Sequence, residues 1–113
     1  MKVRIGETLW EVTLANNATA QAFAERLPFA LTMQELNGNE KYAYVSSPLP
    51  EDASCPDFIH AGDLMLFQNN CIVLFYASFH TTYPYTRIGH LEQPESLAEC
   101  LASRGDVSVA FFA

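Results

Sequence analysis

The chain has 113 residues, of which half are hydrophobic and 17% are charged, and this composition predicts one folded domain over 1–113 rather than a disordered segment. The formal net charge is −7, and the six lysine and arginine residues are scattered along the chain. Because nucleic-acid binding and attachment to an acidic membrane surface both depend on clustered basic side chains, we expect neither.

The N-terminal third predicts a hairpin followed by a helix. Apolar and polar residues alternate over 3–5 and again over 10–14, which is typical of paired strands with one solvated face. The asparagines at 16–17 are suited to cap a helix, because a short side-chain oxygen can accept from the free amides of the first turn. Residues 20–27 carry one apolar stripe at helical spacing. Pro28 ends this helix, which we expect to be a short lid on a barrel.

The middle of the chain predicts two strands and an irregular crossing. Alternation over 29–34 and 42–45 indicates strands on either side of an Asn-Gly-Asn turn. The segment 46–56 contains three prolines and is expected to be irregular. A further strand is expected over 57–60.

The most informative segment runs from Gly62 to Leu91. Two strands, over 64–67 and 71–76, surround a tight turn, and both are apolar on each face, as in the wall of a closed barrel. An aromatic-rich loop follows them, and a further strand is expected over 85–91. The loop holds more tyrosine, phenylalanine and histidine than a connection needs, which indicates that a ligand binds there.

The C-terminal part predicts a second helix and a last strand. Pro94 suits the first turn of the helix, whose buried stripe is expected to consist of Leu97, Cys100 and Leu101. The strand follows over 107–111. The complete pattern, about eight short strands with two short helices, predicts a mainly β, closed barrel, since closure removes exposed strand edges.

The chain lacks the signals of a membrane protein or an exported one. The longest apolar run, 71–77, is far shorter than the roughly 20 residues that a membrane-spanning helix needs. The N-terminal residues lack the apolar block and the cleavage site of a signal peptide. The three cysteines are an odd number, and Cys71 lies in an apolar run, where a thiol packs as a small hydrophobe. We therefore expect reduced thiols and a cytoplasmic location.

The order of elements and several local motifs resemble the cyclophilin fold. More closely, the chain resembles a small bacterial cyclophilin-like family of about 110–120 residues, a length that fits one compact domain. The segments that carry the resemblance are GETLWEVTLANNATAQAFAERLPF, LNGNEKYAY, AGDLMLFQNNCIVLFYASFHTTYPYTRIGHLEQPESLAECL and VSVAFF, which together cover nearly the whole chain. The resemblance implies a cyclophilin-like barrel capped by the two helices.

The same resemblance argues against prolyl isomerase activity. True cyclophilins use a catalytic arginine on a strand after the first helix, with phenylalanine, methionine and glutamine nearby. The corresponding strand here is 40–45, which contains no arginine and is not followed by those residues. The segment 74–76 resembles the family strand that supplies a proline-pocket phenylalanine, which implies that Phe75 or Leu74 keeps an apolar pocket wall. Fold alone does not restore the missing group, so we predict no catalytic residue.

The candidate ligand-binding residues gather around the aromatic loop. Arg87 leads the set, because a planar guanidinium can bind a carboxylate or carbonyl, or stack on an aromatic ring. The alternative for Arg87 is a surface residue paired with an acidic neighbour. For the aromatic residues, including Tyr42 and Tyr44, the alternative is packing in the core and rim of the barrel. The predicted ligand-binding set is Phe75, Phe79, His80, Tyr83, Tyr85 and Arg87.

No metal site or cofactor is expected. The three histidines, His60, His80 and His90, do not follow any metal-ligand spacing, and no nucleophile motif of a hydrolase occurs. Two alternatives stay open for His80 and His90, which lie near Arg87 in the sequence. One is a role in acid–base chemistry, and the other is a structural role fixed by a hydrogen bond.

The sequence therefore predicts a cyclophilin-like binding module for a small molecule or a short peptide segment. Three alternatives stay open. The first is a weak prolyl isomerase in which Arg87 replaces the missing arginine. The second is an accessory partner of a metabolic enzyme. The third is a homodimer whose interface contains exposed tyrosines.

Overall fold

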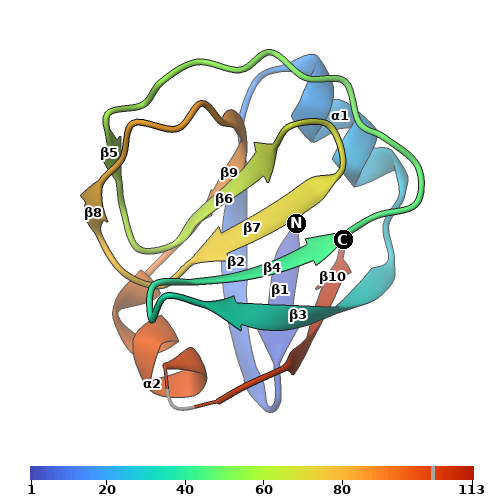
Figure 1. Cartoon of the computed structure of the whole chain (residues 1–113). Helices are drawn as coiled ribbons and strands as arrows, with labels where there is room; N and C mark the ends of the chain where they lie inside the picture. The colour runs from blue at the N-terminus through green and yellow to red at the C-terminus, as the bar shows by residue number, and fades with distance from the viewer. Residues whose placement is uncertain (103) are drawn as a thin grey trace.

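The computed structural model describes residues 1–102 and 104–113. Within these residues, eight antiparallel strands close into a barrel in the order β1-β10-β3-β4-β7-β6-β9-β2 (Figure 1). The predicted closed, mainly β barrel with two short helices is confirmed. The barrel strands are β1 (Lys2–Ile5), β2 (Thr8–Leu14), β3 (Phe29–Leu36), β4 (Glu40–Tyr44), β6 (Asp63–Phe67), β7 (Cys71–Phe75), β9 (Thr86–Leu91) and β10 (Val107–Phe112).

The core of the barrel is built from inward-facing residues of alternating strands. In the first hairpin Val3 pairs with Trp10, and both side chains are buried, whereas their neighbours along each strand face outward. This period of two, predicted from the sequence, places one apolar row of each strand inside the barrel. The result is a single cluster that also includes Val109 and Phe111 of the last strand.

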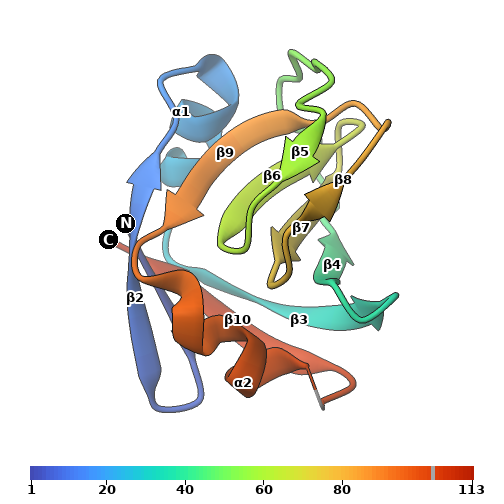
Figure 2. The same cartoon turned by 90° about the vertical axis from the view of Figure 1, so that its left-hand side faces the viewer.

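The two helices lie at opposite ends of the barrel (Figures 1 and 2). Helix α1 (Ala18–Glu25) is capped by Asn17, whose side chain accepts a hydrogen bond of 2.7 Å from the amide of Ala20. Its Phe23 is 1% exposed and meets the ring of Phe111 edge-on, at 5.3 Å between centroids. The predicted lid is therefore a helix that fills one end of the barrel with an aromatic side chain.

Helix α2 (Leu97–Leu101) follows a 3-10 turn, η1 (Pro94–Ser96), and covers the other end. Leu97 and Leu101 are fully buried, as the spacing predicts. Cys100, the third predicted member of the stripe, is only half-buried but packs against the core cluster. One turn of so short a helix has room for two inward-facing positions, and the next residue lies at the side. None of the described helices has the length and apolar character needed to cross a membrane.

Strands β6 and β7 are apolar on both faces because each face packs against a different cluster. Leu64 and Leu74 belong to the cluster inside the barrel. Met65, Val73 and Phe75 point the other way and form a second cluster on the outer face of the wall. The apolar character of these strands is thus explained by two cores on either side of one sheet.

A small ribbon outside the barrel covers part of that outer face. It pairs β5 (Phe58–Ile59) with β8 (Phe79–His80), and Figure 2 shows it beside β6 and β7. The expected strand over 57–60 is therefore present but shorter, and its partner is a segment of the aromatic loop. Ile59 is fully buried in the second cluster. The ribbon and the following residues hold the aromatic loop against the wall.

Candidate functional site

A cavity of about 850 Å³ lies on the outer face of the barrel wall, over β4 and β7. Its floor includes Cys71 and Val73 of β7, which point away from the barrel interior. On one side it is bounded by the turn between β3 and β4, and on the other by the aromatic loop. The aromatic side chains that line it are Tyr42, Tyr44, Phe67, Phe79, Tyr83 and Tyr85.

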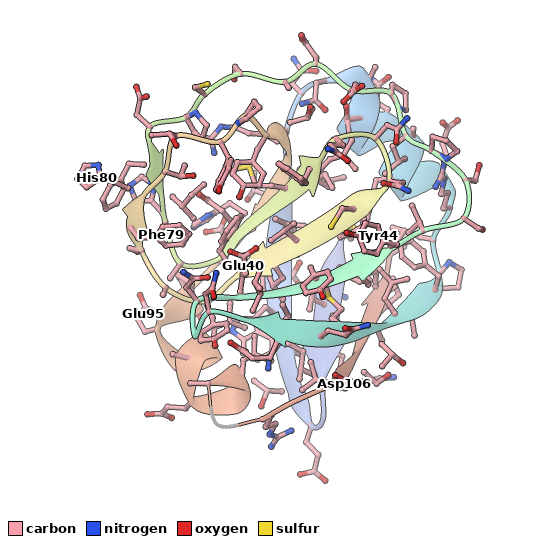
Figure 3. The ribbon with its side chains drawn as sticks, in the orientation of Figure 1. Glu40, Tyr44, Phe79, His80, Glu95 and Asp106 are labelled. Carbon is pink, nitrogen blue, oxygen red and sulfur yellow. The ribbon has the colours of Figure 1, made fainter. Side chains whose placement is uncertain are left out.

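The strand alternation of β4 supplies one wall of this cavity. Glu40, Tyr42 and Tyr44 occupy every second position, so they share the outer face, whereas Lys41 and Ala43 point inward. Figure 3 shows Glu40 on the wall between Phe79 on one side and Tyr44 on the other. Residues separated by more than thirty positions in the chain therefore line one depression.

The aromatic loop is fixed by ring contacts with the wall. The Tyr85 ring lies 5.5 Å from that of Phe75 and 5.6 Å from that of Phe67, between centroids. Phe75 also lies 5.7 Å from Phe79. Such tilted and edge-on pairs add specific stabilisation to area burial, so the loop presents its tyrosines from a defined position. Tyr83, at the tip, is 62% exposed.

The structure brings together four of the six predicted ligand-binding residues. Phe79, His80, Tyr83 and Tyr85 all line the cavity. Phe75 is fully buried directly behind Phe79 and Tyr85, so it supports the cavity from beneath. Their role in ligand binding stays a prediction.

Arg87 lies elsewhere. It is exposed on β9, opposite Met65 in the strand pairing, and it is not among the residues that line the cavity. Its backbone carbonyl accepts a hydrogen bond of 2.8 Å from the side chain of Asn17, which precedes α1. A ligand in the cavity would have to extend along the barrel wall to reach the guanidinium.

Sequence reasoning missed Glu40. The side chain of this residue is buried, with 9% exposed, and it lines the cavity. Burial, and then the negative charge of Glu35, raise the pKa of Glu40 to about 7. Within residues 1–102 and 104–113, no donor forms a hydrogen bond with its carboxyl group. The signal was present in the sequence, because the alternation that places Tyr42 and Tyr44 on one face places Glu40 there too.

A second acceptor without a partner lies beside Glu40. The Oδ1 atom of Asn39 is buried and has no hydrogen-bond partner among the described residues. Asn39 follows a tight turn in which Asn37 and Gly38 both have positive φ, 57° and 69°, as the Asn-Gly pair favours. Asn39 is also among the residues that line the cavity, but its buried Oδ1 atom is not exposed to it. Buried acceptors of this kind are costly unless a donor reaches them.

Two other titratable groups of the cavity, the Cys71 thiol and the Tyr85 hydroxyl, remain protonated near neutral pH. Burial, and then the charge of Glu40, raise the pKa of the Cys71 thiol to about 11 and that of the Tyr85 hydroxyl to about 12. A thiol with so high a pKa is a poor nucleophile, because the thiolate is the reactive form. The Cys71 thiol is therefore unsuited to act as a nucleophile at neutral pH.

The described residues contain no group of three metal-ligating side chains. His80 meets the ring of Phe58 edge-on at 4.8 Å, on the ribbon. His90 lies apart from it and shares a hydrogen bond of 2.9 Å with the buried carboxylate of Asp63, which also accepts from the amide of His60. These contacts give His90 a structural partner on β6.

Comparison with known proteins yields one finding. The model of the cyclophilin-like family matches residues 3–111, nearly the whole chain. No curated protein and no solved structure shows significant similarity to the chain. The family match agrees with the closed barrel and its two helices. The chain therefore belongs to the cyclophilin-like family.

Proposed function

We propose that this protein is a binding module that holds a small molecule or a short peptide segment in the cavity on the outer face of β4 and β7. The observation that carries the proposal is the cavity itself. Its volume of about 850 Å³ falls in the range of ligand sites, and its walls combine aromatic rings with a few polar groups. A loop held by ring contacts at such a place is a common location for binding residues.

The proposal includes the absence of prolyl isomerase activity. Among the described residues, no arginine lines the cavity, and the strand β4 presents Glu40 and two tyrosines on that face. A carboxyl group cannot stabilise the oxygen of a twisted amide as a guanidinium does. In a protease-coupled assay with a proline peptide, we expect a rate equal to that of buffer, and a rate above it would favour the weak isomerase.

The binding proposal predicts that two exposed tyrosines at the cavity control affinity. Tyr44 and Tyr83 are 66% and 62% exposed, so replacing either by serine removes aromatic contact area while leaving the core intact. For ligands found by a thermal-shift screen, we expect the double variant Tyr44→Ser/Tyr83→Ser to weaken binding about tenfold or more, as for aromatic anchors at interfaces. Isothermal titration calorimetry measures the change.

Leu9→Ser is the matched control, because Leu9 is 51% exposed on β2 and does not line this cavity. Affinity that falls equally in both variants would contradict the proposal. Light scattering on the same proteins separates ligand binding from a homodimer, since a dimer formed through these tyrosines would dissociate in the double variant. Arg87→Ala tests the remaining predicted residue, and an unchanged affinity would remove Arg87 from the site.

A further inference from the structure

The side chains that line the cavity carry more negative than positive charge. Its polar lining includes Glu40, whose carboxyl group has no hydrogen-bond donor among the described residues. Asp57 adds a second carboxylate among the lining residues. Within the described chain, no lysine or arginine belongs to this lining.

The nearest basic residue in sequence faces the other way. The ammonium group of Lys41 lies inside the barrel, 2.8 Å from Oε1 of Glu35, and donates to the carbonyls of Arg104 and Gly105 at 2.6 and 2.8 Å. It is fully buried there, on the opposite face of β4 from Glu40. The protein itself therefore leaves the acidic cavity uncompensated, within a chain of net charge −7.

The surroundings of Glu40 favour one kind of ligand. The Glu40 side chain is largely buried and has no donor among the described residues, and an ammonium group in the cavity supplies a charged donor. Aromatic rings attract the same cation through their electron-rich faces, and Tyr42, Tyr44 and Tyr83 line the cavity. Val73 and Phe67 supply an apolar surface for the body of the ligand.

We propose that the cavity selects ligands carrying a protonated amine on an apolar body, with the ammonium group donating to the Glu40 carboxylate. This inference rests on the proposed function and names the chemical class that the site accepts. The amine belongs either to a small molecule or to a lysine side chain of a peptide. Glu40 is the residue that sets the preference for charge.

The test compares three probes of nearly equal size and shape. Benzylammonium, benzyl alcohol and benzoate carry a positive, a neutral and a negative group on the same ring, and their binding is followed by NMR through the amide signals of residues 36–44 and 79–85. We expect benzylammonium to bind about tenfold more tightly than benzyl alcohol, as for a charge-assisted hydrogen bond, and benzoate to bind most weakly. Acetyl-lysine methylamide, compared with its norleucine analogue, tests the peptide source.

Two variants test whether Glu40 is the source of the preference for amines. Glu40→Gln keeps the shape of the side chain and is expected to bring benzylammonium and benzyl alcohol within about twofold of each other. Glu95→Gln removes one negative charge from an exposed acidic residue outside the cavity, away from Glu40 in Figure 3, and is expected to change nothing.

Equal affinity for benzylammonium and benzyl alcohol, or tighter binding of benzoate, would overturn the selection of amines and leave the binding proposal intact. The same preference in Glu40→Gln as in the unchanged protein would also overturn it. If no probe shifts the cavity amides, selection of amines is overturned. Failure of the binding proposal has a separate sign, because the tyrosine variants would then bind the ligands from the screen as well as the Leu9→Ser control does.

Discussion

Replacing Lys41 by methionine is expected to lower the free energy of unfolding by about 3 kcal/mol, measured by urea denaturation at pH 7. The side chain of Lys41 is fully buried, and its ammonium group is held by Glu35 Oε1 and by two backbone carbonyls. Methionine fills a similar volume but supplies no donor, so the two backbone carbonyls and the partly exposed Glu35 carboxylate lose this partner.

The contacts of Lys41 explain why the loss should be large. Glu35 also accepts from the hydroxyl of Tyr76 at 2.8 Å and from the amide of Gly38 at 2.7 Å. Although partial burial works in the opposite direction, the hydrogen bonds from Lys41, Tyr76 and Gly38 keep the pKa of Glu35 below its ordinary value. One ammonium group thus connects β3, β4 and the residues that precede β10.

Lys2→Met is the matched control, because Lys2 lies on the outward face of β1. We expect it to change stability by less than about 0.5 kcal/mol, as for most surface substitutions. The double variant Lys41→Met/Glu35→Gln is expected to recover part of the loss, since a neutral amide at position 35 no longer leaves an unpaired charge. A cost for Lys41→Met as small as for the control would contradict the buried network.

Glu40→Gln is expected to stabilise the protein at pH 8 and to leave its stability unchanged at pH 4. Burial and the charge of Glu35 raise the pKa of Glu40 to about 7, from an ordinary value of 4.5. A raised pKa means that the folded state binds the proton more tightly than the unfolded state. Its contribution to stability is complete below pH 4.5 and is lost as the pH rises through about 7.

Glutamine carries no titrating group, so the variant does not lose stability through ionisation at position 40. We expect the difference in free energy of unfolding to open between pH 4.5 and pH 7 and to reach about 1–2 kcal/mol at pH 8, a value reduced because water reaches the open side of the cavity. Urea denaturation at several pH values measures it. Glu95→Gln serves as the control, and an equal response of both variants to pH would contradict the burial of Glu40.

Most of the barrel was predictable because its strands obey a simple period. The alternation around Val3 and Trp10 assigns an inside and an outside to each position, and the doubly apolar strands of the wall could be recognised by their unbroken hydrophobic runs. The pairing of Phe58 with His80 was not predictable, since two residues carry no periodic signal and their meeting depends on how long connections cross the wall.

Only part of the candidate site was predictable from the sequence. The aromatic loop pointed to Phe79, Tyr83 and Tyr85, because function concentrates in loops with such composition. Arg87 was favoured for its chemistry alone, and the structure places it on an exposed part of β9 outside the cavity lining. Glu40 was overlooked because a lone glutamate on a strand is usually solvated, whereas here it is buried opposite Phe75 of the neighbouring strand β7.

The most direct test of the binding site maps the first ligand from the thermal-shift screen onto the protein by amide chemical shifts in NMR. We predict that the largest changes fall within residues 36–44 and 79–85, the two segments on either side of the cavity. Changes concentrated around Arg87 and Asn17, or around His60 and His90, with those two segments unmoved, would contradict the assignment of the outer-wall cavity as the site.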